Sequence, residues 1–249
     1  MTQFSLPRNV CCLCADGADA LHFRGNRLMA IVGNLPVDLG LVDINPTEMM
    51  FWLYCPIKLP GSHSVKLPSN LTQFDEITES VYYDVKVNER WSNEFDNRWY
   101  DSYVYLTAKT LYVAGGYIGN RPGWHCDGFG TNDLNYIWYS SAPTDFFSSG
   151  IFGINVSDDC DESMRDMECA SQFHKHVQYP CKHLLKLDPT VIHRPPVKFE
   201  PGMRTFVKVS VSDHKYNLEG NSINHALNLD VDFQPRGVER NHPGKDFES

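Results

Sequence analysis

The chain has 249 residues, 42% of them hydrophobic and 12% aromatic, with a formal net charge of −9 and a pI near 5.5. This length and apolar content predict one folded domain over residues 1–249 with a substantial core, and they exclude a globally disordered chain. The acidic balance gives no support to bulk nucleic acid binding, and no apolar run is long enough to cross a membrane.

The N-terminal segment carries a cluster of three cysteines, Cys11, Cys12 and Cys14, shortly after Arg8. It lacks the apolar core that is typical of a signal peptide. The eight cysteines of the chain are therefore expected to be reduced, and the protein is expected to be cytoplasmic. We interpret the cluster as structural thiols rather than a zinc site, because no second Cys/His pair follows at finger-like spacing.

Residues 1–100 are expected to form an N-terminal elaboration of β and α elements that packs on the core. Gly33-Asn34 lies between two apolar runs and predicts a hairpin turn. Residues 56–69 contain three prolines and a glycine, which predicts a loop or a lid.

Two helices are predicted at the end of this elaboration. The first has one apolar face, formed at three- and four-residue steps by Leu71, Phe74, Ile77 and Val81. The second is indicated by aromatic residues at four-residue steps, which are Trp91, Phe95 and Trp99. Apolar faces of this kind pack on a core, so we expect both helices to support one face of a sheet.

Residues 101–230 are expected to form the core, because short strand-like segments follow one another with turns between them. The predicted strands are residues 103–107, 110–114, 124–127, 134–140, 150–156, 190–193 and 204–212. Residues 157–188 interrupt them and are expected to be an insertion with a helix capped by Ser157. The predicted fold class is mainly β with flanking helices (α+β), as a barrel or sandwich rather than a parallel sheet.

The stretch Arg121-Pro-Gly-Trp-His-Cys-Asp127 contains the strongest chemical signal of the chain. On an extended strand His125 and Asp127 project to the same side, so both can bind one metal ion. His193, on a later predicted strand, is the candidate third ligand. Two histidines and one carboxylate on one face of an ion leave the other positions open, as in non-haem Fe(II) oxygenases.

Other histidines compete with His193 for the third position. They are His174, His176 and His183, all within the predicted insertion. We favour His193 because it lies in a strand-like run and because Arg204 follows on the next predicted strand.

This ordered set of residues resembles the Fe(II)/2-oxoglutarate-dependent dioxygenases, over roughly residues 105–212. The resemblance implies a double-stranded β-helix (jelly-roll) core and 2-oxoglutarate as the co-substrate that chelates iron. It makes His125, Asp127 and His193 the iron ligands.

The same resemblance makes Arg204 the anchor of the far carboxylate of 2-oxoglutarate. Many members have a hydroxyl residue two positions after this arginine, where this chain has Phe206. Lys208, on the same strand face as Arg204, is therefore a competing anchor.

Further candidates lie on the predicted strands around the motif. Tyr112, Asn135 and Tyr139 are expected to bond 2-oxoglutarate or the substrate, or else to pack in the core. The expected substrate is a small molecule, a nucleotide or a protein side chain, hydroxylated at a C–H bond as 2-oxoglutarate is decarboxylated to succinate. The cofactor set supplies that chemistry, so no general base is needed.

Two other functions remain open from the sequence. One is a metal-dependent enzyme of the cupin type that does not use 2-oxoglutarate. Phe206 supports this alternative, because it stands where many of the dioxygenases have a hydroxyl residue. The other is a binding module without catalysis, in which the histidines serve the structure. Succinate release that requires both iron and 2-oxoglutarate distinguishes the oxygenase from both.

Overall fold

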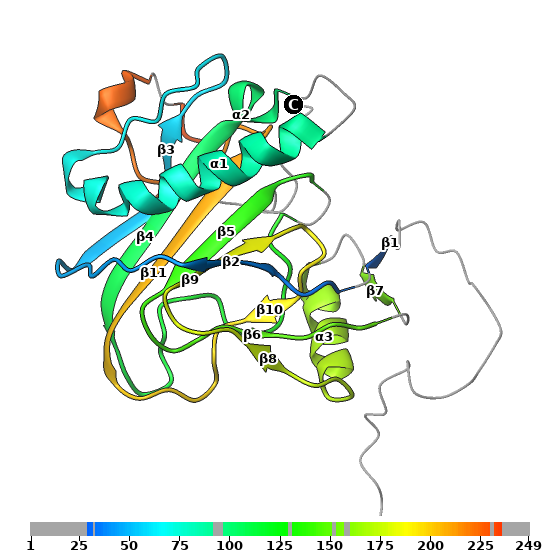
Figure 1. Cartoon of the computed structure of the whole chain (residues 1–249). Helices are drawn as coiled ribbons and strands as arrows, with labels where there is room; N and C mark the ends of the chain where they lie inside the picture. The colour runs from blue at the N-terminus through cyan, green and yellow to red at the C-terminus, as the bar shows by residue number, and fades with distance from the viewer. Residues whose placement is uncertain are drawn as a thin grey trace, which may run out of the picture.

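The computed structural model describes residues 29–31, 33–91, 97–128, 131–150, 153–156, 160–229 and 232–235 (Figure 1). The strands are β1 (Met29–Ile31), β2 (Val37–Leu41), β3 (Met50–Lys58), β4 (Tyr103–Val113), β5 (Leu134–Tyr139), β6 (Asp145–Phe146), β7 (Ile154–Val156), β8 (Val177–Gln178), β9 (His183–Leu187), β10 (His193–Arg194) and β11 (Gly202–Ser212). The α-helices are α1 (Asp75–Trp91), α2 (Arg98–Asp101) and α3 (Cys160–Ser171), and the 3-10 helices are η1 (Ser69–Phe74) and η2 (His225–Leu227). The Cys11, Cys12 and Cys14 cluster lies outside the described residues.

The fold is mainly β with a few helices, which confirms the coarse fold class predicted from the sequence. Six strands form an antiparallel sheet in the order β2-β9-β5-β11-β4-β3, and a smaller sheet has the order β10-β6-β8. A third pairing joins β1 to β7. In Figure 1, α1 crosses the strands of the six-stranded sheet, and β10, β6 and β8 lie together beside α3. None of the helices in the described part of the chain is long and apolar enough to cross a bilayer.

The predicted apolar helix face is confirmed, and it covers one face of the six-stranded sheet. Leu71, Phe74, Ile77 and Val81 are all fully buried, and they belong to the main core cluster. Valines of β11 and aliphatic residues of β4 supply the other side of this cluster. Because the helix face repeats every three or four residues and the strand face every two, both patterns point their apolar side chains into one core.

Strand β11 is central in the sheet, because it pairs with β4 on one side and β5 on the other. Its residues alternate between the two faces. Val207, Val209 and Val211 point into the core beneath α1, whereas Phe206 joins a second core cluster that contains Phe146 of β6. The even-numbered positions of β11 therefore face the smaller sheet, and Lys208 is one of them.

Three predicted elements differ in the structure. The two strands expected at 103–107 and 110–114 are one continuous strand, β4, because β11 pairs with it along its whole length. The hairpin expected at Gly33-Asn34 does not form: β1 pairs with β7 and β2 pairs with β9. A Cβ at Gly33 would lie 2.8 Å from the Ile192 side chain, so this glycine serves a close approach rather than a hairpin.

Other differences concern segments that only tertiary contacts define. Part of the predicted insertion is structural, because β9 lies between β2 and β5 in the six-stranded sheet. Trp91 ends α1 and Trp99 lies in the separate four-residue helix α2, so the expected helical face over 91–99 does not continue. Phe95 lies outside the described residues. The loop expected from residue 56 starts after Lys58, where β3 ends.

Candidate metal centre

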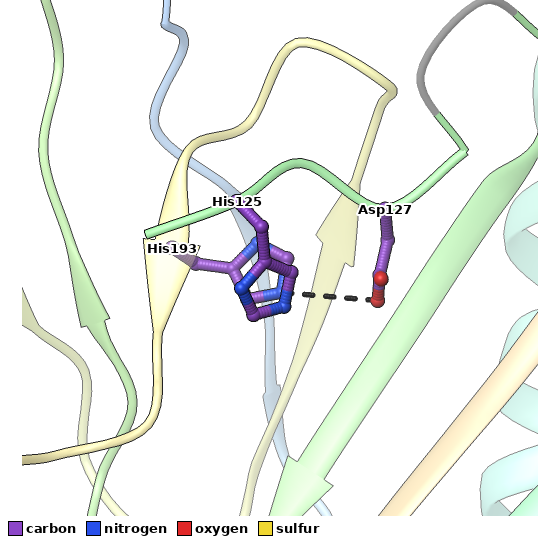
Figure 2. Close-up of side chains that lie close together, drawn as sticks. All are labelled: His125, Asp127 and His193. Carbon is purple, nitrogen blue, oxygen red and sulfur yellow. Dashed lines mark ion pairs between the residues drawn. The ribbon is translucent and has the colours of Figure 1, made fainter. Parts of the chain in front are cut away.

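The three side chains of the predicted triad lie together between the two sheets. His125 and His193 form an antiparallel bridge, in which each backbone N–H donates to the carbonyl oxygen of the other at 2.9 Å. This pairing brings the two imidazole centroids to 4.5 Å. Asp127 Oδ2 lies 3.7 Å from Nε2 of His193, as the dashed line in Figure 2 marks. One ligand atom from each residue falls within a 4.8 Å span, close enough to share a metal ion.

Both imidazoles are oriented by backbone carbonyl groups. Nδ1 of His125 is 2.8 Å from the carbonyl oxygen of Gly123, and Nδ1 of His193 is 3.1 Å from that of Val191. A carbonyl oxygen only accepts hydrogen bonds, so Nδ1 of each ring carries the proton. Nε2 keeps its lone pair, which is the form that binds a metal.

The electrostatic environment also favours neutral imidazoles. Burial and the neighbouring His193 together lower the pKa of His125 to about 4, against the opposing effect of Asp127. Burial likewise lowers the pKa of His193 below its usual value. Both rings are therefore neutral near pH 7 and can bind a cation without first losing a proton.

Asp127 is already paired with a buried lysine. Lys208 Nζ lies 3.0 Å from Asp127 Oδ2 and 2.9 Å from the Tyr54 hydroxyl. Burial raises the pKa of the Asp127 carboxyl, but Lys208 and the two imidazoles lower it more, so the pKa lies well below its usual range. Burial disfavours charge on Lys208, but Asp127 and Tyr54 outweigh this effect and raise its pKa. The pair is therefore ionic, and a metal ion would share the carboxylate with Lys208.

Glycines shape the loop on either side of the ligands. Gly123 has φ +83° and Gly128 has φ +73°, a region that side chains with a Cβ rarely adopt. A Cβ at Gly128 would also lie 2.9 Å from Cβ of Asp133. These turns set the direction of the chain as it enters and leaves the short segment that carries His125 and Asp127.

Trp124, next to His125 in the chain, belongs to a buried apolar cluster. Trp124 is fully buried, and its ring packs edge-on against Phe147 with centroids 4.8 Å apart. The Arg194 guanidinium lies over the same indole, 4.4 Å from its centroid. Trp124 therefore packs in a buried cluster rather than reacts.

Arg204 is a buried guanidinium without an acidic partner among the described residues. It is 2% exposed, and it donates to the carbonyl oxygens of Ser141 and Ala142 and to the Asn120 side-chain oxygen, at 3.1 to 3.4 Å. Its guanidinium lies over the Phe206 ring, 5.3 Å from the centroid. Burial lowers its pKa to about 10, against the opposing effects of Tyr139 and Cys181. A charge in this environment has unused capacity for an anion.

The other predicted cofactor contacts occupy different positions. Asn135 is buried opposite Ser210 on the face that carries Lys208, and its Oδ1 accepts the Ser210 hydroxyl at 2.6 Å. Tyr139 is buried on the same face and donates to the carbonyl oxygen of Tyr179 at 3.2 Å. The structure does not bring Tyr112 to the site: it pairs with Met203 on the opposite face of the sheet and is 61% exposed.

The rival histidines lie apart from the triad. His176 Nε2 contacts the Ser171 carbonyl oxygen at 2.9 Å, and its ring packs on Trp124. His174 stacks on Phe147, and His183 pairs with Asp38. Within the described residues, His125, Asp127 and His193 are the group of such side chains placed to hold a metal ion.

Tyr54 is the site residue that the sequence analysis missed. It has φ +45° at a register shift between β3 and β4, and its backbone N–H donates to the Thr107 hydroxyl at 3.0 Å. This shift turns its ring under Lys208, with the ammonium 4.7 Å from the ring centroid. The shift arises from strand pairing, so the surrounding apolar run gives no signal of it.

The sequence matches no protein-family model and has no significant match among curated proteins. The chemistry of the site therefore rests on its own geometry. Two neutral imidazoles and a carboxylate are nitrogen and oxygen ligands suited to Fe(II), Mn(II), Co(II) or Zn(II), and three protein ligands leave positions for other molecules.

Proposed function

We propose that this protein is an Fe(II)- and 2-oxoglutarate-dependent oxygenase that hydroxylates a C–H bond of its substrate. The triad of His125, Asp127 and His193 is the observation that carries the proposal. Its ligand atoms lie within 4.8 Å of one another and come from two short backbone segments that pair directly. A two-histidine, one-carboxylate set that leaves the other positions of the ion open is the arrangement of non-haem Fe(II) oxygenases.

The order of strands supports a double-stranded β-helix core for this function. From β4 onward, the chain passes repeatedly between the two sheets: β4, β5, β9 and β11 belong to the six-stranded sheet, β6, β8 and β10 to the smaller one, and β7 pairs with β1 outside both. The bridge from His125 to His193 adds a further pairing beside β10. Two antiparallel sheets whose strands are interleaved along the chain support a jelly roll, with the proposed site between them.

Arg204 is the better of the two proposed anchors for 2-oxoglutarate. Lys208 is already paired with Asp127, whereas Arg204 has only neutral oxygen partners among the described residues. Its planar guanidinium suits a bidentate carboxylate. Phe206 stands where many of the dioxygenases have a hydroxyl residue. Its ring lies against the Arg204 guanidinium, so its role here is to pack on the proposed anchor.

The protein's part in the reaction is positioning. His125, Asp127 and His193 would hold the metal, and Arg204 would hold the far carboxylate of 2-oxoglutarate. Bound Fe(II) with 2-oxoglutarate and O2 supplies the oxidation, in which one oxygen atom enters succinate and the other the hydroxylated product, with release of CO2. The buried ring of Phe146, whose centroid lies 6.0 Å from that of His193, would limit access of water to that ligand.

Succinate release is the test. Protein purified without oxygen and then given Fe(II), 2-oxoglutarate and O2 should form succinate slowly even without substrate. Omission of iron or of 2-oxoglutarate, or the change His125→Ala, should abolish it. Metal binding without succinate formation under any condition would favour the cupin-type alternative, and a failure to bind any divalent metal would favour the binding module.

A further inference from the structure

A tyrosine-lined cavity lies next to the metal centre, between β3, the start of β4 and the segment that follows β11. Its empty volume is about 440 Å³, a figure that includes the solvent at its open mouth. Tyr54, Tyr105 and Tyr216 form its inner wall, and Leu59, Ile223 and Phe233 contribute apolar side chains.

The three tyrosine rings are fixed against one another. The centroid of Tyr216 lies 5.5 Å from that of Tyr54 and 5.4 Å from that of Tyr105, and the last two rings lie 6.2 Å apart. Tilted and edge-on pairs at these distances are favourable, so the wall is rigid before any ligand arrives.

The hydroxyl groups of these tyrosines are engaged with other protein groups. Tyr105 donates to the carbonyl oxygen of His214 at 3.0 Å, and Tyr216 donates to Asp133 Oδ2 at 2.5 Å. The Tyr54 hydroxyl contacts Lys208 at 2.9 Å. Because the polar ends have partners, the rings offer the cavity mainly their carbon atoms.

Tyr54 is the wall that the cavity shares with the metal centre. Its hydroxyl and Asp127 Oδ2 both contact the Lys208 ammonium, at 2.9 and 3.0 Å. A molecule held against the other side of this ring is therefore separated from the ligand carboxylate by Tyr54 and one ammonium group. The reacting C–H bond of such a molecule would have to pass the edge of the Tyr54 ring to reach the metal.

The charges around the cavity select against ionic ligands. No carboxylate is among the described residues that line it, and two lysines lie nearby, Lys215 in the lining and Lys208 behind Tyr54. A cation would find no counter-ion among the described residues that line the cavity, because Asp127 is already paired with Lys208. An anion would lose its hydration water on contact with the ring carbons. Lys215, the one lysine among the described lining residues, is exposed to solvent and would compensate this loss only weakly.

We propose that this cavity binds the substrate, and that the substrate is an uncharged small molecule with an aromatic or alicyclic ring. The identification of the bound molecule as the substrate rests on the proposed oxygenase function. Its expected chemistry, an uncharged ring compound, rests on the cavity alone. It narrows the substrate class toward apolar metabolites and away from nucleotides.

Three fluorinated probes with the same ring test the charge preference: 4-fluorobenzyl alcohol, 4-fluorobenzylammonium and 4-fluorobenzoate. Their binding is measured by the broadening of the fluorine NMR signal on addition of protein. We expect the neutral alcohol to bind at least about tenfold more tightly than either ion, about 1.4 kcal/mol in binding free energy. Equal or tighter binding of an ion would overturn the proposal.

A variant that fills the cavity tests the location. Ile223, which is 37% exposed in the lining, changed to Trp should abolish binding of the alcohol. Leu41→Trp is the matched control, because Leu41 lies on the edge strand β2 and is 64% exposed. Loss of binding in Leu41→Trp, or retention in Ile223→Trp, would place the probe elsewhere.

The distance to the metal centre is tested with Mn(II), a paramagnetic ion that broadens nearby fluorine signals. Mn(II) binding is first measured directly. If the ion binds, it should strongly relax the bound alcohol in the native protein but not in His125→Ala, and unchanged relaxation would overturn the substrate assignment. If no divalent ion binds, the proposed function fails, while the charge preference of the cavity is still decided by the three probes.

Discussion

Lys208 places its ammonium 3.0 Å from Oδ2 of Asp127, the same carboxylate oxygen that faces His193. The lysine is 7% exposed, so water screens this pair only weakly. The pair therefore stabilises the metal-free protein, and its positive charge opposes a cation that binds the same oxygen.

The change Lys208→Met should move stability and metal affinity in opposite directions. Without the ammonium, Asp127 becomes a partly buried carboxylate with no cationic partner, which should lower the free energy of unfolding by about 2 kcal/mol. A divalent ion no longer meets a neighbouring positive charge, so its affinity should rise by about tenfold or more. Thermal unfolding and titration calorimetry with Mn(II) measure the two effects.

Lys186→Met is the matched control for this prediction. Lys186 is also in an ion pair, with Asp84 at 2.7 Å, but it lies on β9 and does not contact the triad. The Lys186→Met variant should have a lower free energy of unfolding than the native protein and the same affinity for Mn(II). A fall in Mn(II) affinity in Lys208→Met would show that the lysine orients Asp127 more than it repels the ion.

Loss of either His125 or Asp127 should strongly weaken metal binding. His125→Ala and Asp127→Ala each remove one of three ligands, so metal affinity should fall by about 100-fold or more, and succinate formation with it. His176→Ala should leave both unchanged, because its ring packs on Trp124 and its Nε2 contacts a backbone carbonyl. Equal losses in all three variants would place the metal at a different histidine.

Arg204→Met should weaken binding of 2-oxoglutarate without weakening the metal. Loss of a buried, charge-assisted carboxylate contact costs about 2 kcal/mol, so the apparent KM for 2-oxoglutarate should rise by about 30-fold. Lys109→Met serves as a control. Lys109 lies on β4, on the same face of the six-stranded sheet as Arg204, so the variant removes a positive charge from that face and leaves Arg204 in place. An unchanged KM in Arg204→Met would move the anchor to Lys208.

The parts of the fold and site that the sequence predicts are those fixed by local geometry. The face of Leu71, Phe74 and Ile77 is a property of a helix, whatever the helix packs on. The spacing of His125 and Asp127 likewise predicts that both side chains can reach one ion. The strand expected over 124–127 is only a bridge at His125, with Asp127 in a turn, but the two side chains and His193 do come together.

The missed features depend on partners distant in sequence. The sequence predicts that His183–Leu187 belongs to a polar insertion. In the structure this segment is strand β9, because β2 and β5 pair with it on either side. Tyr54 reaches the site only because β3 shifts its register against β4. Tyr112 lies on a strand close to the motif in sequence, but alternation along the strand turns its side chain to the opposite face of the sheet.

Lys58 should make stability depend on pH in the alkaline range. It is fully buried, donates to the carbonyl oxygens of Leu59, Tyr100 and Ser102, and lies over the Trp99 ring. Burial lowers its pKa from 10.5 to about 8, partly offset by Asp101. Between these two pH values the folded protein loses its proton before the unfolded chain does, so the free energy of unfolding rises with pH.

The comparison with Lys58→Met isolates this effect from other titrating groups. The free energy of unfolding of the native protein, minus that of the variant, should be flat below about pH 8 and rise by about 2 to 3 kcal/mol by pH 10.5. Urea unfolding at a series of pH values measures it. A difference that stays flat would mean that the three carbonyl groups keep the ammonium charged in the folded state.

Gly128→Ala should disturb the metal loop more than its backbone angle alone explains. Gly128 has φ +73°, which costs a residue with a Cβ about 1 kcal/mol. The added Cβ would also lie 2.9 Å from Cβ of Asp133, an atom close to the backbone that cannot swing away. The carbonyl oxygen of Gly128 accepts the Thr131 hydroxyl at 2.6 Å, so a shift here moves the turn that follows Asp127.

Gly150→Ala separates the two costs. Gly150 has φ +62°, but a Cβ there would meet nothing within 4 Å, so this variant should lose only about 1 kcal/mol in the free energy of unfolding. Gly128→Ala should lose about 2 to 3 kcal/mol and should also bind Mn(II) less tightly, because Asp127 moves with the loop. If both variants lose the same stability and keep the same metal affinity, the contact with Asp133 does not position the carboxylate, and the two histidines must fix the ion with an Asp127 that adjusts freely.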